Sequence, residues 1–520
     1  MEMKPKFEWR KSIVGPTLVV LAIFVVLNMI SRDWFGRMDL TKEKMYTLSE
    51  SSRSVVQKID DLMTVRVYFS ENLPGEYGNN RRFLQDILEE YAAFSRGNIK
   101  PKFFVPSASQ NLEQAARSAG IQQLELKVVE NDKIEVKRVF MGLVIEYQDE
   151  KEVIPFIQKT TALEYEITSK IKKLVDDDNE AIAIAQFTSS NRTNQGIRQF
   201  LGERYQIQDI DMTNPIPSGL GVLIMNGVSV SDSLDTNQLQ NLKDYITSGG
   251  NMLISQGRVD VALNQQIGFF QGTNIQSNIF DFLNEYGVNI EENLVLDKQN
   301  GQINIPQRVG PFQSWSPLDY PFFPTVNTFD DSIKIVNGLE RVQFNFCSEI
   351  TIDSLAQNVT PIMFSSNNSA TMAGYYNLYP NTKESPAPIF NQLNEGKKIL
   401  GVIIETITGG QIILLSESDF FTDPVDQTLA RVFPKRQKDN YTFVVNSIDF
   451  LMGDEELIAL RSREITNRPL LSEAEGLDKN AKSRWKWFNI VLPTVLVVGF
   501  GFFRLRRSKA RSRLLEEIYG

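Results

Sequence analysis

The sequence predicts an α/β body held between two transmembrane helices. Residues 12–31 are 20 consecutive uncharged residues, mostly Val, Leu, Ile and Phe. As a helix they would span about 30 Å, the thickness of a bilayer core. Residues 487–503 form a second uncharged stretch near the other end of the chain. Between the two, short apolar runs alternate with amphipathic stretches, which is the pattern of strands alternating with helices.

A cleaved signal peptide and a buried core helix are the alternatives to a membrane anchor at residues 12–31. The apolar stretch is longer than a signal-peptide core, and residues 30–34 offer no pair of small residues for cleavage. Two such stretches framing the whole chain also argue against core helices. We therefore expect two uncleaved anchors, at residues 12–31 and 487–503.

The basic residues that flank the two stretches predict their orientation. Residues 1–11 carry a net charge of +2, and the tail of residues 504–520 carries +4. The positive-inside rule then places both termini in the cytoplasm and the main domain outside it. The linker of residues 467–486 is also basic near its end, which weakens this asymmetry.

Charge and residue usage exclude several classes of function. The net charge of −9 leaves −15 for the residues between the two basic ends, which argues against nucleic acid as a partner. The basic tail instead suits the anionic inner leaflet of a lipid bilayer. Cys347 is the only cysteine and there is no histidine, so Ser-His-Asp and Cys-His catalysis and histidine-bound metals are excluded. Because no phosphate-binding GxxxxGK[ST] loop occurs, ATP would be bound by another subunit. We expect no catalytic, cofactor or metal site.

Residues 32–160 predict a thioredoxin-like α/β unit. Ser49 is a favourable N-cap for its first helix. Without a CxxC motif this unit has no thiol redox chemistry, and an interaction domain is expected. A linking segment, residues 161–180, follows with a helix over 161–175. We expect helices over residues 49–59, 81–94 and 111–118, and strands over 64–69, 100–105, 124–129, 134–139, 142–147 and 153–157.

Residues 181–466 predict a second α/β domain with insertions, built on a doubly wound parallel sheet. The apolar runs 181–187 and 221–226 read as buried parallel strands, and Gly249-Gly250 marks a helix end. The pattern resembles the Rossmann-like sheet of class I glutamine amidotransferases. Their nucleophilic cysteine and its histidine partner are missing, so that activity is not carried over. Further helices are expected over 196–204, 236–247, 278–286 and 441–452, and further strands over 207–212, 252–255, 396–405, 410–416 and 457–461, with a strand pair over 294–305.

Polar residues follow the strands of this sheet, where ligands of such sheets lie. The candidate ligand or partner residues are Ser189, Ser190, Asn191, Arg192, Asn226 and Arg258. Their side chains could hydrogen-bond a sugar or a peptide. A solvated loop is the alternative interpretation.

Three further segments carry candidate residues. Residues 311–324 contain four prolines and five aromatic residues, so we expect no regular element there. They form either a partner-docking loop around Trp315 or a segment packed on its own domain. Asp419, with two neighbouring carboxylates, could bind a cation, although a capping role is favoured. Within the two spans, Asn28, Gly499 and Gly501 are candidates for packing against another membrane protein.

The chain resembles the gliding-motility-associated ABC transporter auxiliary family (GldG type). Position 450 is Phe where Trp is expected in many relatives, and the apolar character is kept. The matching residues are Asp39-Leu40-Thr41, Tyr46-Thr47-Leu48-Ser49, the GVLIMN strand with Gly249-Gly250, Ser418-Asp419-Phe420, Asn440, Asn446, Ile448-Asp449-Phe450-Leu451 and Arg461-Ser462-Arg463.

The resemblance implies an inner-membrane subunit that works with a separate ATPase subunit and a multi-span permease, in support of gliding motility and the associated secretion. The leading hypothesis is a non-enzymatic subunit whose periplasmic domain contacts an envelope protein. The alternative is a saccharide- or peptide-binding receptor of the same transporter. The central sheet also resembles a domain of an intraflagellar-transport protein, which favours protein–protein contact.

Overall fold

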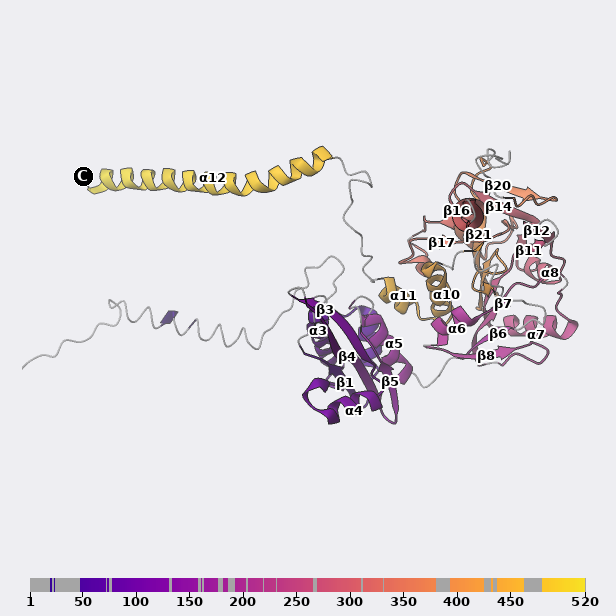
Figure 1. The fold of residues 1–520 in the computed structure, drawn as a ribbon, viewed down its shortest axis with the longest axis horizontal. Helices are drawn as coiled ribbons and strands as arrows, with labels where there is room; N and C mark the ends of the chain where they lie inside the picture. The colour runs from indigo at the N-terminus through magenta and orange to yellow at the C-terminus, as the bar shows by residue number, and fades with distance from the viewer. Residues whose placement is uncertain are drawn as a thin grey trace, which may run out of the picture. The chain divides into compact units, whose positions relative to one another are not determined.

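The chain divides into two units, Met1–Glu464 and Ile465–Gly520 (Figure 1). The first unit is a mixture of helices and sheets, the α/β class that the sequence predicts. The computed structural model describes residues 19–20, 23, 47–71, 73, 77–130, 133–157, 160, 163–175, 181–185, 192–202, 204–217, 219–230, 232–264, 269–309, 312–330, 332–379, 393–424, 432–433, 437–462 and 479–519.

The first part of the body is a five-stranded sheet with its helices. Its elements are α2 (Glu50–Gln57), β1 (Met63–Phe69), α3 (Gly78–Phe94), β2 (Ile99–Phe104), the 3-10 helix η2 (Pro106–Ala108), α4 (Gln110–Ser118), β3 (Gln123–Glu130), β4 (Lys133–Tyr147), β5 (Glu150–Ile154) and α5 (Leu163–Val175). The strand order is β2-β1-β4-β3, with β5 also paired to β4. β1 runs parallel to β2 and antiparallel to β4.

Local sequence signals set several of these boundaries. The Ser49 side chain accepts a 3.0 Å hydrogen bond from the Ser52 backbone N–H and so caps α2, as expected. Gly120, with φ +94°, follows α4. The strands expected over residues 134–139 and 142–147 are one continuous strand, β4, which pairs with β3 in its first half and with β1 and β5 in its second.

The second part of the body is built on a nine-stranded sheet. Its elements are β6 (Ala181–Ala185), β7 (Arg192–Thr193), α6 (Gln195–Gly202), β8 (Gln206–Ile210), β9 (Leu220–Met225), α7 (Thr236–Thr247), β10 (Asn251–Ser255), α8 (Ile279–Asn284), β13 (Val288–Ile290), β18 (Ile350–Ile352), β19 (Val359–Phe364), β21 (Ile399–Glu405), β22 (Gln411–Leu415), β23 (Asp423–Pro424), α10 (Lys438–Leu451) and α11 (Glu455–Ser462). The order is β13-β18-β21-β22-β10-β9-β6-β8, with β19 paired to β21. The five strands from β22 to β8 are parallel, and the remaining strands are antiparallel.

Helices cover both faces of this sheet. Ile182 and Ile184 of β6 pack with α6 and α10 on one face, whereas Ala183 and Ala185 pack with α7 and α8 on the other. This alternation explains the continuous apolar run in β6, because both faces of the strand are buried. α7 begins with a capping box at Asp235. It ends before Gly249, whose φ is +91°, and this glycine stop is the one that the sequence predicts.

Smaller strand pairs and a 3-10 helix complete the body. They are β11 (Val259–Asn264), β12 (Phe269–Asn274), β14 (Asn293–Asp297), β15 (Asn300–Val309), β16 (Phe312–Val326), η3 (Lys334–Val336), β17 (Val342–Gln343) and β20 (Ser369–Ala373). The expected strand pair over residues 294–305 is wrong in its pairing. β14 pairs with β20, and β15 pairs with β16.

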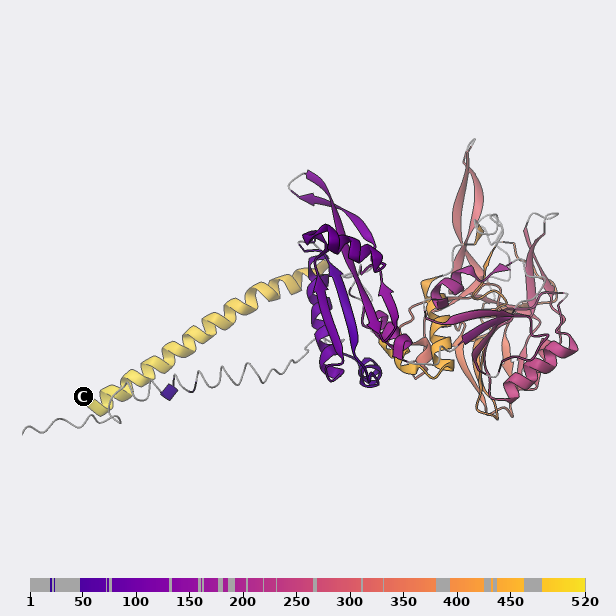
Figure 2. The ribbon, with the colours of Figure 1, turned by 90° about the horizontal axis from the view of Figure 1, so that it is seen from below.

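The expectation that residues 311–324 form no regular element is also wrong. Residues 312–324 belong to β16, which pairs with β15 in a long hairpin that stands out from the body (Figure 2). Proline disrupts a strand only where its missing N–H is needed. Because β16 pairs with β17 only at Thr325 and Val326, most of its second edge requires no N–H donors.

α11 replaces the last strand expected at residues 457–461. A short apolar run such as Leu457–Leu460 fits a strand or a helix equally well. Here its buried side chains, Leu457, Ile458 and Leu460, lie on a helix instead.

The second unit contains one long helix, α12 (Lys479–Tyr519). Its 22-residue segment Lys486–Arg507 is long and apolar enough to cross a membrane, and it contains the expected span of residues 487–503. The expected first span, residues 12–31 with Asn28, lies outside the described residues except for Val19, Val20 and Ile23, which are helical.

Candidate functional site

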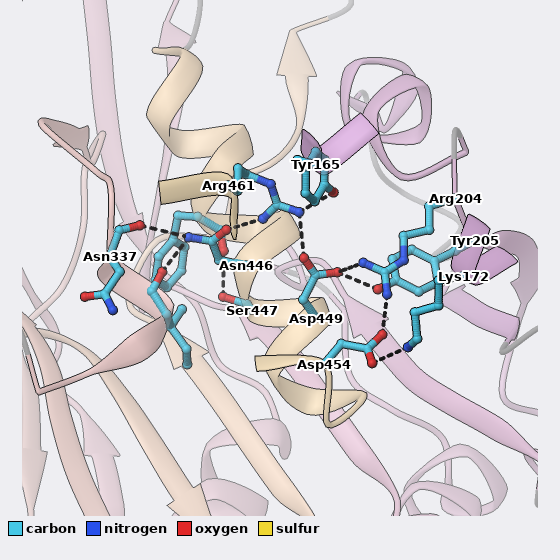
Figure 3. A network of polar contacts seen from close by, with 12 residues as sticks. Tyr165, Lys172, Arg204, Tyr205, Asn337, Asn446, Ser447, Asp449, Asp454 and Arg461 are labelled. Atoms are coloured by element: carbon cyan, nitrogen blue, oxygen red, sulfur yellow. Dashed lines mark hydrogen bonds and ion pairs between the residues drawn. The ribbon is translucent and has the colours of Figure 1, made fainter. Parts of the chain in front are cut away.

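A buried cluster of charged side chains joins α5, α10 and α11 (Figure 3). At its centre is Asp449 on α10, whose side chain has no exposed surface. One oxygen, Oδ1, accepts hydrogen bonds from Arg204 Nη1 at 2.7 Å and from the Tyr205 hydroxyl at 2.6 Å. The other, Oδ2, accepts one from Arg461 Nη2 at 2.6 Å. Each carboxylate oxygen therefore faces one arginine.

The cluster reaches α5 through two further contacts. Asp454, in the turn between α10 and α11, binds both Arg204 and Lys172 of α5. Arg461 of α11 binds the hydroxyl of Tyr165 on α5, and its guanidinium lies 4.5 Å from the centre of that ring. α5 is thus held to both C-terminal helices of the body.

The electrostatics of the cluster keep Arg204 and Arg461 charged and Tyr205 neutral. Burial alone would lower the pKa of Arg204, but the Asp449 carboxylate outweighs it and the pKa is raised. The pKa of Arg461 is raised for the same reason. Burial and then Asp449 raise the pKa of the Tyr205 hydroxyl. These groups keep one protonation state at physiological pH, which suits a structural joint and not proton transfer.

A second polar cluster joins the first half of α5 to the start of α2. Glu164 Oε1 accepts hydrogen bonds from the Ser49 backbone N–H and the Ser52 hydroxyl, each at 2.7 Å. The Thr168 hydroxyl lies 2.8 Å from that of Ser52 and 2.5 Å from that of Tyr91 on α3. Ser52, Thr168 and Tyr91 are all buried, so these bonds are shielded from water.

We call α2, α5, α10 and α11 with these two clusters the junction. α2, α5 and α11 pack against one another. α2 is the first helix of the body, and α11 is the last helix before α12 in the chain. The two ends of the body therefore meet on α5, which also joins the two sheets in sequence.

The predicted ligand site at the carboxyl ends of the strands is filled by the chain itself over β9 and β10. The Gly227 backbone N–H donates to the Ser418 carbonyl at 3.3 Å, and that of Gly257 donates to Ser418 Oγ at 3.0 Å. A Cβ at Gly227 would lie 2.4 Å from Ser418 Cβ, so only glycine fits there. The Ser255 hydroxyl also donates to the Glu417 carbonyl. The residues after β22 thus close this part of the sheet edge.

The candidate ligand residues that the structure describes have internal partners. Asn226 Nδ2 donates to Asn194 Oδ1 at 2.8 Å, and Arg192 in β7 pairs with Pro424. Arg258 donates to the Ile290 carbonyl at 3.0 Å. Its guanidinium also contacts Glu292 and lies 4.3 Å from the centre of the Phe280 ring. Ser189, Ser190 and Asn191 lie outside the described residues.

The remaining candidates lie elsewhere. The Asp419 carboxylate accepts a 3.2 Å hydrogen bond from the Thr422 hydroxyl, a capping contact, and no described residues form a cluster that could hold a metal ion. Trp315 lies on the β15–β16 hairpin, far along the chain from the strand ends, and is 39% exposed. Gly499 and Gly501 lie on α12 with open space where a side chain would be.

The residues of the junction were only partly accessible to sequence reasoning. Asn446, Asp449 and Arg461 are among the residues that match the family, and the sequence offers Asp449 as a carboxylate within the apolar run of residues 448–451. Arg204 and Lys172 were missed. They lie 245 residues from Asp449 and 282 from Asp454 in the chain, so no local pattern links them to their partners.

Comparisons with known proteins identify the family. The family described as an ABC-type uncharacterized transport system matches residues 152–451, more than half of the chain, and the chain belongs to this family. A domain of unknown function matches residues 42–146. The protein is thus a transporter-associated subunit that works with other transporter components.

One relative and two solved structures complete the comparison. An uncharacterized protein of Borreliella burgdorferi is 21% identical over 96% of this chain and 98% of its own length. The N-terminal domain of mmIFT52 is 13% identical, covers 52% of this chain and 96% of its own, and has a TM-score of 0.32. A ThuA-like protein from Bacteroides uniformis is 10% identical, with 53% and 92% covered and a TM-score of 0.30. Both TM-scores are low, so neither likeness supports a conclusion about this chain.

Proposed function

We propose that this chain is a non-enzymatic inner-membrane subunit of an ABC transporter complex, with two spans, cytoplasmic termini and its main domain in the periplasm. It works with a multi-span permease and a separate ATPase subunit, and supports gliding motility and the associated secretion. The family match and the α12 segment Lys486–Arg507 support membrane association within a transport system. The GldG-type motifs support the link to gliding.

The observation that carries this proposal is the junction. The proposed first span ends at residue 31, ahead of α2, which begins at Glu50, and α11 is the last described helix before the second span. Both helices are held to α5 by buried polar contacts, Ser52 to Glu164 on one side and Arg461 to Tyr165 on the other. A movement of the two spans by the permease would therefore reach α5, and through it both sheets. The subunit in this way couples ATP-driven changes in the membrane to a periplasmic envelope protein.

The closed edge of the parallel sheet supports contact with a partner over catalysis at that edge. Ser418 occupies the crevice over β9 and β10 in which sheets of this type hold small ligands. The Ser418 carbonyl and hydroxyl already accept hydrogen bonds from the backbone N–H groups of Gly227 and Gly257, so the chain itself fills this part of the edge. Partner proteins would then bind to other surfaces of the body.

Affinity purification of the full chain from its native membrane tests this proposal. A permease with many spans and an ATPase should be recovered with it in constant ratio and identified by mass spectrometry. An unrelated two-span membrane protein with the same affinity tag is the control. Recovery of neither component above the level of that control would contradict the proposal.

A further inference from the structure

The β15–β16 hairpin presents a face that no part of the described body covers. On this face three cross-strand pairs follow one another: Gln302 with Asp319, Asn304 with Pro317, and Pro306 with Trp315. Because side chains alternate along a strand, these six residues point to the same side. Gln302, Pro306, Trp315, Pro317 and Asp319 are exposed. The face therefore combines one flat aromatic ring, rigid proline rings and hydrogen-bonding side chains.

The opposite face of the hairpin is anchored in the body. Ile303, Tyr320, Phe322 and Phe323 are fully buried in one apolar cluster. The Tyr320 hydroxyl donates a 2.5 Å hydrogen bond to the Leu378 carbonyl. The exposed face is thus built on a fixed support, which lowers the cost of ordering it when a ligand binds.

A hollow of about 430 Å³ lies on the same exposed face. Its lining includes Gln302, Pro317, Asp319 and Pro321, together with Lys298, Asn300, Leu318 and Leu393. Gln302 Nε2 donates to Asp319 Oδ1 at 2.8 Å, which fixes both side chains at its wall. Trp315 stands two residues from Pro317 and so lies about 7 Å further along the strand.

We propose that this face binds a neutral oligosaccharide, a site distinct from the junction and additional to the proposed transporter role. A pyranose ring has an apolar C–H face and a hydroxyl edge. The C–H face stacks on the Trp315 indole and the proline rings, while the carboxamide of Gln302 and the carboxylate of Asp319 hydrogen-bond the hydroxyls. An indole that is 39% exposed gains burial on stacking without any rearrangement.

The chemistry of the face distinguishes a sugar from other ligands. Asp319 and the acidic body disfavour the phosphates of a nucleic acid. A peptide that adds a strand would need the free edge of β15, whereas Trp315 and the hollow lie on the face of the hairpin. A neutral saccharide is the ligand class that uses the aromatic ring and the polar groups together.

Titration calorimetry on the full chain tests this proposal, in a detergent without a sugar head group, since maltoside detergents would compete. The probes are cellotetraose, maltotetraose and N-acetylchitotetraose. At least one should bind, and Trp315→Ala should raise its Kd by about fivefold to tenfold. The matched control is Phe364→Ala on β19, where the aromatic side chain is 37% exposed. That variant should leave the Kd unchanged.

Three outcomes would overturn the proposal: no binding of any probe, equal binding by Trp315→Ala, or equal losses in Trp315→Ala and Phe364→Ala. Binding of a polyproline peptide in place of the sugars, lost in Trp315→Ala, would also overturn it and assign the face to a peptide. Trp315→Ala should still co-purify with permease and ATPase. Failure of the saccharide proposal can therefore be distinguished from failure of the proposed transporter role.

Discussion

Arg461 Nη2 lies 2.6 Å from Asp449 Oδ2, and this contact ties α11 to α10 inside the body. Arg204 binds the other oxygen of the same carboxylate at 2.7 Å. The Asp449 side chain is fully buried, and both arginine side chains are 12% exposed. Ions taken out of water to this degree are stable only as a set, so removing one member leaves the others without compensation.

Loss of the Asp449 charge should destabilise the body strongly. Asp449→Asn removes the carboxylate that pairs with Arg461 and leaves buried Arg204 with Asp454 alone, and we expect the free energy of unfolding to fall by about 3–5 kcal/mol. Urea denaturation of the purified chain, followed by circular dichroism, measures the change. The control is Glu285→Gln, which removes the exposed ion pair with Lys243 and should cost less than about 1 kcal/mol. Equal losses in the two variants would contradict the role assigned to the cluster.

Glu152 should make the stability of the body depend on pH in the acid range. Its carboxylate lies 2.6 Å from Lys173 Nζ and 2.9 Å from Lys170 Nζ. Burial alone would raise the pKa of Glu152, but the two lysines outweigh it and lower the pKa below 4.5. The pKa of Glu152 is therefore lower in the folded chain than in the unfolded chain. Its contribution to the free energy of unfolding is fully present above the unfolded pKa and is lost as the pH falls through the folded pKa.

Comparison with Glu152→Gln measures this contribution. Near neutral pH the variant should be less stable than the parent chain by roughly 1 kcal/mol. The difference should shrink as the pH falls below 4.5, the ordinary value of the group. A difference that stays constant down to about pH 3 would show that the two lysines do not set the effect.

Cys347 should not react with thiol reagents in the folded chain. Its side chain is fully buried, and burial raises the pKa of the thiol well above its usual value. The reactive thiolate is therefore neither accessible nor populated. Reaction with a maleimide should be absent in buffer and complete in denaturant. Rapid labelling of the native chain would show that the core around Cys347 opens.

The sequence predicts those elements that have local signals. α7 runs from Thr236 to Thr247 as expected, because an Asp cap and a glycine stop bound it. The paired strand β16 was missed, since the prolines that argue against a strand locally are accommodated by pairing with a distant partner. The helix α11 was missed because its apolar run is too short to show a period.

The contacts of the junction are still harder to predict from the sequence, because they join residues far apart in the chain. Asp449 and Arg461 are 12 residues apart, whereas Arg461 and Tyr165 are separated by 296 residues. Charge pairs at such separations follow from the fold and cannot be read from one sequence. The closure of the strand ends by Ser418 was hidden for the same reason, since the Ser418 side chain meets Gly257 across 161 residues.

The small residues of α12 should hold the permease. Gly499 and Gly501 have open space around them, so another helix can approach the backbone closely there. Gly499→Leu with Gly501→Leu should reduce the recovery of permease and ATPase on affinity purification about tenfold or more, a coupling loss of roughly 1.4 kcal/mol. The control replaces exposed Val497 and Val498 with Leu, which keeps an apolar helix. Full recovery from the glycine variant would show that the body, and not the anchors, holds the complex.

The topology of the chain is the most direct test of the central claim, that a two-span subunit carries its body outside the cytoplasm. Cysteines placed singly at Asn131 and Ser508 can be labelled in intact cells, because buried Cys347 gives no background. An impermeant maleimide should label Asn131→Cys in intact cells. It should label Ser508→Cys, on the part of α12 that is proposed to be cytoplasmic, only after the membrane is opened. The reverse pattern, with Ser508→Cys accessible from outside and Asn131→Cys protected, would contradict the orientation and the transporter role built on it.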